Sequence, residues 1–256
     1  MNSRIRLLVA VCGATLTGAL LTGPATAAPA AEDSRSRVPV AAMGAGDGTK
    51  AADLQAKLCT GAFDTKNPQL GPATNTLPGP AQKPVGPLLK GYDRTGKLKP
   101  DAFLSAYWTG KPTWKYPPDD GFARHGGKLD KNKTRLKAGQ KLDRFGHEGG
   151  SFLAPAGAPY SQRALPPDSL QTIDDKYPCN YHVYTVAKPF TVWQGGIAAW
   201  FEQPGGGLQI QLDPALVPGA PTPKLSVKWL IDNGYLTRTG TSAGMSMSAG
   251  TSATTG

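Results

Sequence analysis

The chain has 256 residues, 39% of them hydrophobic and 8% aromatic, which is enough to bury a core. Its 32 glycines and 24 prolines favour a loop-rich fold over a helix bundle. The formal net charge is +10, yet the chain has no block of Lys and Arg, no zinc-finger spacing and no recognition-helix pattern. These features argue against a nucleic-acid partner and leave small phosphate-bearing ligands as partners that the charge would attract.

The N-terminus has the pattern of an export signal. Arg4 and Arg6 precede the apolar residues 7–21, and the small residues 25–27 resemble a cleavage site. The apolar run is too short to span a bilayer. We therefore expect a signal peptide over residues 1–27 and a secreted protein without a membrane span.

Two segments lack any regular periodicity. Residues 28–52 are rich in Ala, Gly and Ser, and residues 237–256 consist mostly of Ser, Thr, Gly and Ala. Such compositions bury too little apolar surface to fold. We expect a disordered leader and a disordered tail.

Residues 53–135 combine frequent Pro and Gly with one clear helix signal. Pro100 fits the first turn of a helix over residues 99–108, which places four apolar side chains on one face. These side chains are Phe103, Leu104, Tyr107 and Trp108. Trp114, Tyr116 and Phe122 follow and predict a satellite aromatic cluster. We expect a helical, loop-rich cap.

Residues 136–236 are richer in strand signals. The patterns predict a strand at 136–144, strands at 181–186 and 190–193, and a hairpin that joins 197–201 to 208–212 through a Gly turn. A short helix or strand is expected at 227–233. The composition therefore predicts an α+β domain over residues 136–236.

Cleavage of the signal peptide would leave two cysteines, Cys59 and Cys179. In an exported chain, two cysteines most simply form one disulfide, which here would join the two predicted parts of the protein. The alternative is a pair of buried free thiols.

Residues 142–170 hold the densest set of candidate site residues. Arginines and aromatic side chains alternate there with glycines and prolines that fix turns. The candidates are Arg144, Phe145, Phe152, Tyr160 and Arg163. Guanidinium groups bind phosphate or carboxylate, and aromatic faces stack on rings, so this set suits a planar anionic ligand. The alternative is a set of core aromatics with a solvated arginine rim.

Several uncommon strings occur together in one order. They are RFG at 144–146, PYSQRALPP at 159–167, YHVY at 181–184 and WFEQPGGG at 200–207. This series resembles the necrotizing-toxin (TNT) domain family, whose members hydrolyse NAD to ADP-ribose and nicotinamide. Residues 59–71, 86–92 and 103–108 are similar to the larger secreted form known from fungal surface NADases.

The resemblance implies a fold and a site. The fold would be a bent β-sheet of the ADP-ribosyltransferase-like type, with NAD in its cleft and a helical cap. Arg144 and Phe145 would lie beside the nicotinamide end, Gln203 at the scissile bond, and Arg163 near the pyrophosphate. Phe152 and Tyr160 are further candidates for the cleft wall.

Some residues depart from the family pattern. Glu202 stands where the family usually has Gly, and strand alternation favours a side chain that points to solvent rather than toward the reacting ribose. His182 is expected to be a structural residue on a sheet face. Neither the scattered histidines nor the isolated Asp213 and Asp232 predict a metal site, so we expect no cofactor beyond the substrate.

The resemblance thus predicts a secreted NAD(P) glycohydrolase and allows an immunity protein as a partner. One alternative is a protein mono-ADP-ribosyltransferase, which would need Glu148 or Glu202 to activate the acceptor. The other is a secreted binding module without enzymatic activity.

Overall fold

The computed structural model describes residues 57–110 and 113–239. The predicted signal peptide at 1–27, the predicted leader at 28–52 and residues 240–256 of the predicted tail lie outside these ranges. No helix among the described residues is long and apolar enough to cross a membrane.

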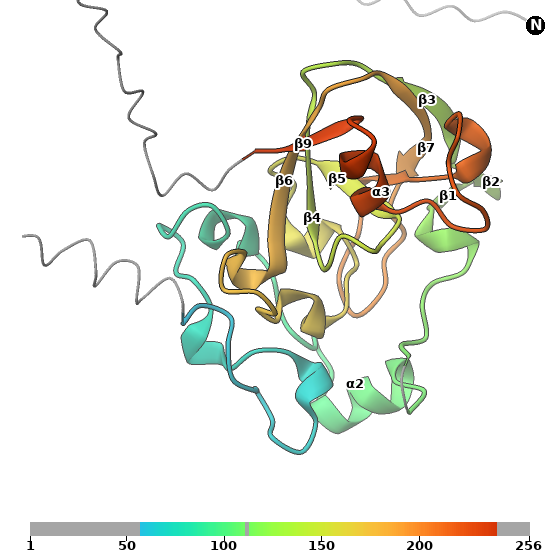
Figure 1. Ribbon diagram of the computed structural model, residues 1–256. Coiled ribbons are helices and arrows are strands. Elements are labelled where there is room, and N and C mark those ends of the chain that lie inside the picture. The colour runs from blue at the N-terminus through green and yellow to red at the C-terminus, as the bar shows by residue number, and fades with distance from the viewer. Residues whose placement is uncertain (1–56, 111–112, 240–256) are drawn as a thin grey trace, which may run out of the picture. The chain divides into compact units, whose positions relative to one another are not determined.

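The described residues form short strands, two α-helices and several single 3₁₀ turns (Figure 1). The helices are α2 (Pro100–Tyr107) and α3 (Val227–Asp232). The strands are β1 (Arg124–His125), β2 (Lys128–Leu129), β3 (Asn132–Leu136), β4 (Lys141–Phe145), β5 (Phe152–Pro155), β6 (Tyr181–Val186), β7 (Phe190–Gly196), β8 (Leu208–Gln211) and β9 (Leu236–Arg238).

Seven strands form one antiparallel sheet in the order β3-β7-β8-β5-β4-β6-β9. Only a few residue pairs join the two halves of this sheet. β5 pairs with β4 at Pro155 and Ala154, and then with β8 at Leu153 and Phe152. The strands β4 and β5 therefore part after two residue pairs, and this gap in the ladder positions the candidate site.

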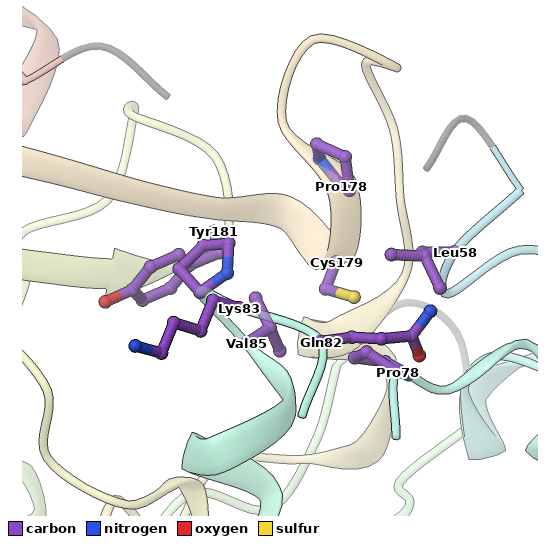
Figure 2. Close-up of a pocket in the computed structure, with 9 residues that line it drawn as sticks. Leu58, Pro78, Gln82, Lys83, Val85, Pro178, Cys179 and Tyr181 are labelled. Carbon is purple, nitrogen blue, oxygen red and sulfur yellow. The ribbon is translucent and has the colours of Figure 1, made fainter. Parts of the chain in front are cut away.

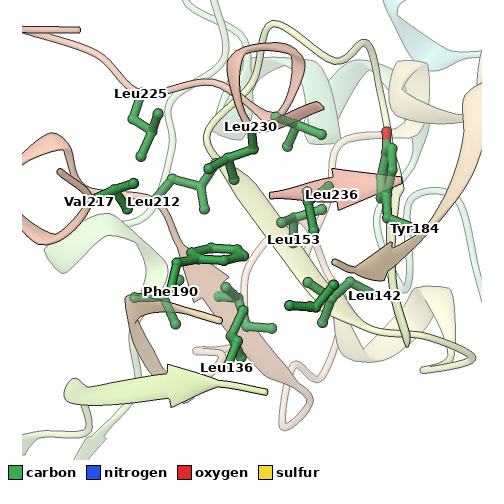
Figure 3. Packing of buried hydrophobic residues seen from close by; sticks show 14 residues of the cluster. Leu136, Leu142, Leu153, Tyr184, Phe190, Leu212, Val217, Leu225, Leu230 and Leu236 are labelled. Carbon is green, nitrogen blue, oxygen red and sulfur yellow. The ribbon is translucent and has the colours of Figure 1, made fainter. Parts of the chain in front are cut away.

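The main hydrophobic core covers one face of this sheet (Figure 3). Leu142, Tyr184 and Ile210 supply strand side chains, and Leu225 and Leu230 come from the chain around α3. All five are nearly inaccessible to solvent. Burial of such side chains contributes about 1.5–3 kcal/mol each. A six-residue helix is too short to be stable alone, so the burial of its apolar face stabilises α3.

The described part of residues 53–135 consists of loops, 3₁₀ turns, α2, the β1–β2 ribbon and residues 132–135 of β3. Pro100 begins α2, as predicted, and the helix buries Phe103 against Phe201 and Trp114. The rings in this cluster contact one another edge-on or tilted. The centroid of Phe201 lies 5.5 Å from that of Trp114 and 6.5 Å from that of Phe103. The aromatic cluster therefore joins α2 to the 200–207 segment.

Cys59 and Cys179 form a disulfide across 120 residues of sequence, and both are fully buried. They belong to a second core cluster with Phe145, Tyr160 and Tyr181. The bridge therefore fastens the first described turn to the chain that enters β6.

Three sequence predictions differ from the structure. The tail predicted at 237–256 begins inside β9, where Thr237 and Arg238 pair with β6. The strand expected at 136–144 is two strands, because residues 137–140 turn between β3 and β4, and Lys137 N–H donates to the Gln140 side chain. The hairpin exists, but its first strand is β7 rather than 197–201. Residues 197–207 form an irregular loop in which Phe201 and Glu202 have positive φ, a conformation that a strand excludes.

Candidate active site

A hollow opens where β4 and β5 part. Its cavity volume is about 50 Å³, and it is open to solvent. We call it the β4–β5 hollow, and its lining is Asp143, Arg144, Phe145, Phe152, Leu153, Ala154, Arg163, Leu165, Ile197 and Gln209. Four predicted site residues, Arg144, Phe145, Phe152 and Arg163, thus lie around one hollow.

Arg144 bridges the gap between the strands. Its Nη1 donates to the Phe152 carbonyl at 2.7 Å, and its Nε donates to the His147 carbonyl at 2.9 Å. No partner for Nη2 occurs among the described residues. Burial lowers the pKa of Arg144, yet an arginine stays protonated at neutral pH. Arg144 therefore lines the hollow as a guanidinium cation that two backbone carbonyls hold in place.

Two of the aromatic candidates line the hollow, and the third lies in the hydrophobic core. Phe145 lines the hollow and packs edge-on against Tyr160, with ring centroids 4.9 Å apart. Phe152 is partly exposed at the rim. Tyr160 is fully buried, and its hydroxyl donates to the Pro166 carbonyl at 2.8 Å. The structure corrects the predicted role of Tyr160: it supports Phe145 from behind rather than lining the cleft.

Arg163 lines the hollow with its donors already used. Nη1 and Nη2 donate to the two carboxylate oxygens of Asp143 at 2.6 and 2.9 Å, and Nε and Nη2 also donate to the Ala158 carbonyl. Its side chain is 4% exposed. A phosphate would have to displace a buried carboxylate to bind these donors, and the contact of Arg163 with the pyrophosphate stays a prediction.

Gln203 does not line the hollow. Its side chain is 3% exposed, and its Nε2 donates to the carbonyls of Asp93 and Phe201. The amide thereby fastens the 200–207 loop to the preceding part of the chain. The structure therefore does not bring Gln203 together with Arg144 and Phe145 at the hollow.

The glutamine at the hollow is Gln209 on β8. Its Nε2 donates to the Asp120 carbonyl at 2.9 Å, which leaves Oε1 to accept a hydrogen bond from a ligand. Sequence reasoning missed Gln209 because it weighed the family string at 200–207 above the strand that follows. The alternation of Gln209 and Gln211 with apolar neighbours in β8 was the available signal.

A second polar group lies behind Arg144. The register of β4 and β6 pairs Arg144 with His182, so both side chains share one face of the sheet. Burial lowers the pKa of His182, its Nε2 lies 3.2 Å from Asn180 Oδ1, and its Nδ1 has no partner in the described chain. Glu148 Oε1 lies 3.9 Å from that Nδ1. His182 is therefore a buried, predominantly neutral residue near neutral pH.

The two glutamates that a transferase reaction would require are engaged elsewhere. Glu202 accepts a hydrogen bond from the Tyr107 hydroxyl at 2.9 Å and is part of the α2 aromatic region. Glu148 pairs with Arg238 through both carboxylate oxygens. Neither residue belongs to the lining of the β4–β5 hollow. Glu202 was expected to point to solvent, and its contact with Tyr107 holds it partly buried instead.

A second hollow lies beside the disulfide (Figure 2). Leu58, Val85 and Tyr181 are among its apolar lining residues, and Gln82 and Lys83 also line it. Its lining contains no carboxylate, histidine or arginine, and we assign no chemistry to it. Within residues 57–110 and 113–239, no three His, Cys, Asp or Glu side chains gather in a way that suits a metal ion.

Comparison with known proteins identifies the family. The family model described as Tuberculosis necrotizing toxin (TNT) matches residues 135–239. The conidial surface nicotinamide adenine dinucleotide glycohydrolase nadA of Aspergillus fumigatus is 44% identical over 181 residues, which cover 67% of this chain and 69% of that protein. The chain belongs to the TNT family. The match to nadA is longer than the TNT domain itself, so the likeness includes chain outside that domain.

A solved structure of tuberculosis necrotizing toxin, complexed with its immunity factor IFT, is also similar to this TNT-family chain. The identity is 23%, the TM-score is 0.44, and the match covers 60% of this chain and 78% of the toxin.

Proposed function

We propose that this TNT-family protein is an NAD(+)/NADP(+) glycohydrolase that cleaves the bond between ribose and nicotinamide at the β4–β5 hollow. The observation that carries the proposal is the 44% identity to a surface NAD glycohydrolase over two thirds of both chains. The hollow adds a guanidinium cation, an aromatic wall and an amide oxygen, which together suit a dinucleotide.

The reaction needs little proton transfer. Nicotinamide carries positive charge while it is bound to ribose and leaves as a neutral base, so no general acid is required. Positive charge builds on the ribose in an oxocarbenium-like transition state, as in glycoside hydrolysis. The protein must position the ribose, favour that charge and orient one water molecule.

The lining residues fit these tasks as follows. Gln209 Oε1 would accept a hydrogen bond from a ribose hydroxyl or from the attacking water. Arg144 Nη2 would donate to an anionic oxygen of the diphosphate. Phe145 and Phe152 would hold the flat nicotinamide ring. Arg163, paired with Asp143, keeps Phe145 in place through the cation–π contact at 5.1 Å.

Further parts of the proposal rest on sequence and on general chemistry. We propose that the sheet is of the ADP-ribosyltransferase-like type, with residues 53–135 as a cap on the catalytic domain at 136–236, and that NAD is the substrate without any added cofactor. We also propose secretion through the signal peptide at 1–27, which agrees with a buried disulfide. A producing cell would then need an immunity protein, since loss of NAD would harm it as well.

The test is incubation of the purified protein with NAD, with products separated by chromatography. We expect equal amounts of free ADP-ribose and nicotinamide. ADP-ribose attached to protein would indicate the transferase instead, and intact NAD at high enzyme concentration would indicate a binding module. Hydrolysis is favoured over transfer because neither Glu148 nor Glu202 reaches the hollow.

A further inference from the structure

The loop that carries one hydrogen-bond partner of Arg144, His147, is held from the opposite side by the C-terminal part of the chain. We define the arginine loop as residues 146–151, between β4 and β5. On its inner side, Arg144 donates to the His147 carbonyl. On its outer side, the backbone N–H groups of Val227 and Lys228 donate to the Gly150 and Glu148 carbonyls at 3.0 and 2.8 Å.

Glu148 is the one acidic residue of this loop, and it points toward β6 and β9. Arg238 Nε donates to Glu148 Oε1 at 2.8 Å, and Arg238 Nη2 donates to Oε2. The Tyr184 hydroxyl donates to Oε1 at 3.2 Å. The Glu148 side chain is 14% exposed. Two parallel charge-assisted bonds to a mostly buried carboxylate fix its orientation as well as its position.

We propose that Arg238 is a positioning residue for the substrate-binding arginine. Through Glu148, it holds the arginine loop in the conformation in which Arg144 lines the hollow and its Nη2 lies against Gly146 and Gly150. The strand β9 then takes part in substrate binding although it does not line the hollow. This inference rests on the proposed function only for its kinetic readout.

The effect should appear in substrate binding. If Arg238 is replaced, the Glu148 carboxylate remains without its partner, and the loop reorients to hydrate it. If Glu148 is replaced by Gln, the loop loses the charge-assisted bonds that fix it to β9. Arg144 then loses the fixed carbonyl of His147, and its Nη2 no longer occupies one position. An interaction made equally in the ground state and the transition state changes KM and leaves kcat.

The experiment measures kcat and KM for NAD, Tm, and amide hydrogen exchange in four full-length variants: Arg238→Gln, Arg238→Lys, Glu148→Gln and Lys228→Gln. Lys228→Gln is the matched control, because it removes an exposed ion pair with Asp232 from the same C-terminal segment. For Arg238→Gln and Glu148→Gln we expect KM to rise about tenfold, with kcat within about twofold of the original protein. Arg238→Lys should recover part of the loss, and Lys228→Gln should change neither constant by more than about twofold.

Hydrogen exchange makes the test independent of activity. Faster exchange confined to residues 146–151 in Arg238→Gln supports the inference. Unchanged exchange with unchanged KM overturns it, as does an activity that falls only in proportion to the folded fraction. If the unmodified protein leaves NAD intact, the proposed function fails, and the exchange result alone decides the role of Arg238.

Discussion

The carboxylate of Asp143 accepts hydrogen bonds from both terminal nitrogens of Arg163, at 2.6 and 2.9 Å. The Asp143 side chain is 0% exposed and the Arg163 side chain 4%. The Tyr181 hydroxyl and the Gly157 N–H complete the shell of the carboxylate. The sequence predicts a ligand-binding arginine at 163, and the structure pairs this arginine with a buried carboxylate at the hollow. We expect the pair to contribute mainly to stability.

Replacement of Arg163 by Met should destabilise the fold by about 3–5 kcal/mol, because Asp143 would remain buried and charged. Thermal melting would show a drop in Tm of about 10 °C. The double variant Asp143→Leu with Arg163→Met should melt above the single variant, since it leaves no unpaired charge. An unchanged Tm with a raised KM for NAD would instead restore the phosphate-binding role of Arg163.

Gly150 leaves room for the Arg144 guanidinium. A Cβ added at Gly150 would lie 2.0 Å from Arg144 Nη2. Because that atom is the end of a flexible side chain, Gly150→Ala should move Arg144 at small cost to stability. We expect KM for NAD to rise about tenfold, as for loss of one charged contact. Gly79→Ala is the control, because its Cβ would lie 3.6 Å from the nearest atom; equal kinetics for the two variants would contradict this account of Arg144.

The disulfide closes a long loop between Cys59 and Cys179. Such a bridge restricts the unfolded chain and typically contributes about 2–5 kcal/mol. Replacement of both cysteines by Ala should therefore lower Tm, and added reductant should lower the Tm of the original protein but not that of the variant. Equal melting of the two proteins without reductant would contradict a stabilising bridge.

His182 predicts how stability depends on pH. Burial lowers its pKa in the folded state below the ordinary 6.5, against the attraction of Glu148 and with the repulsion of Arg144 and Arg238. The unfolded chain therefore binds the proton first as pH falls. Its contribution to stability is full above pH 6.5 and decreases as pH falls from 6.5 through the lower folded pKa.

Urea unfolding at pH 7.5 and pH 5.5 measures this effect. The free energy of unfolding should decrease between the two values, and the decrease should be smaller in His182→Phe, which keeps an aromatic ring between Tyr177 and Tyr184. The same slope in both proteins would assign the pH dependence to other groups. Burial raises the pKa of Glu148, but the hydrogen bonds and charge of Arg238 outweigh burial and lower this pKa. The contribution of Glu148 to stability is therefore lost only below about pH 4.5.

The sequence predicts much of the fold because its signals are local. Pro100 begins α2, the alternation at 181–186 forms β6, and two cysteines meet in one bridge. The turn at 137–140 was missed because Leu136 and Leu142 both suit one continuous strand. The gap between β4 and β5 follows from pairing with β8, which no local pattern contains.

Residue types in the sequence predicted which side chains line the site, but they did not predict the contact partners of those side chains. Arg144 and Phe145 lie at the hollow, as their neighbours in sequence suggested. Arg163 carries the same guanidinium group as Arg144, but it pairs with Asp143, which lies 20 residues earlier in the sequence. Gln203 and Gln209 are six residues apart, and only the path of the 200–207 loop decides which amide reaches the hollow.

The central claim is that Gln209, together with Arg144 and Phe145, forms the site of NAD hydrolysis. The most direct test compares kcat for NAD and Tm in Gln209→Ala and Gln203→Ala. We predict that Gln209→Ala lowers kcat by at least about a hundredfold, the loss typical of one preorganised polar group, while the protein stays folded. Gln203→Ala should melt earlier and keep its turnover per folded molecule. Full turnover in folded Gln209→Ala, with turnover abolished in folded Gln203→Ala, would contradict the account.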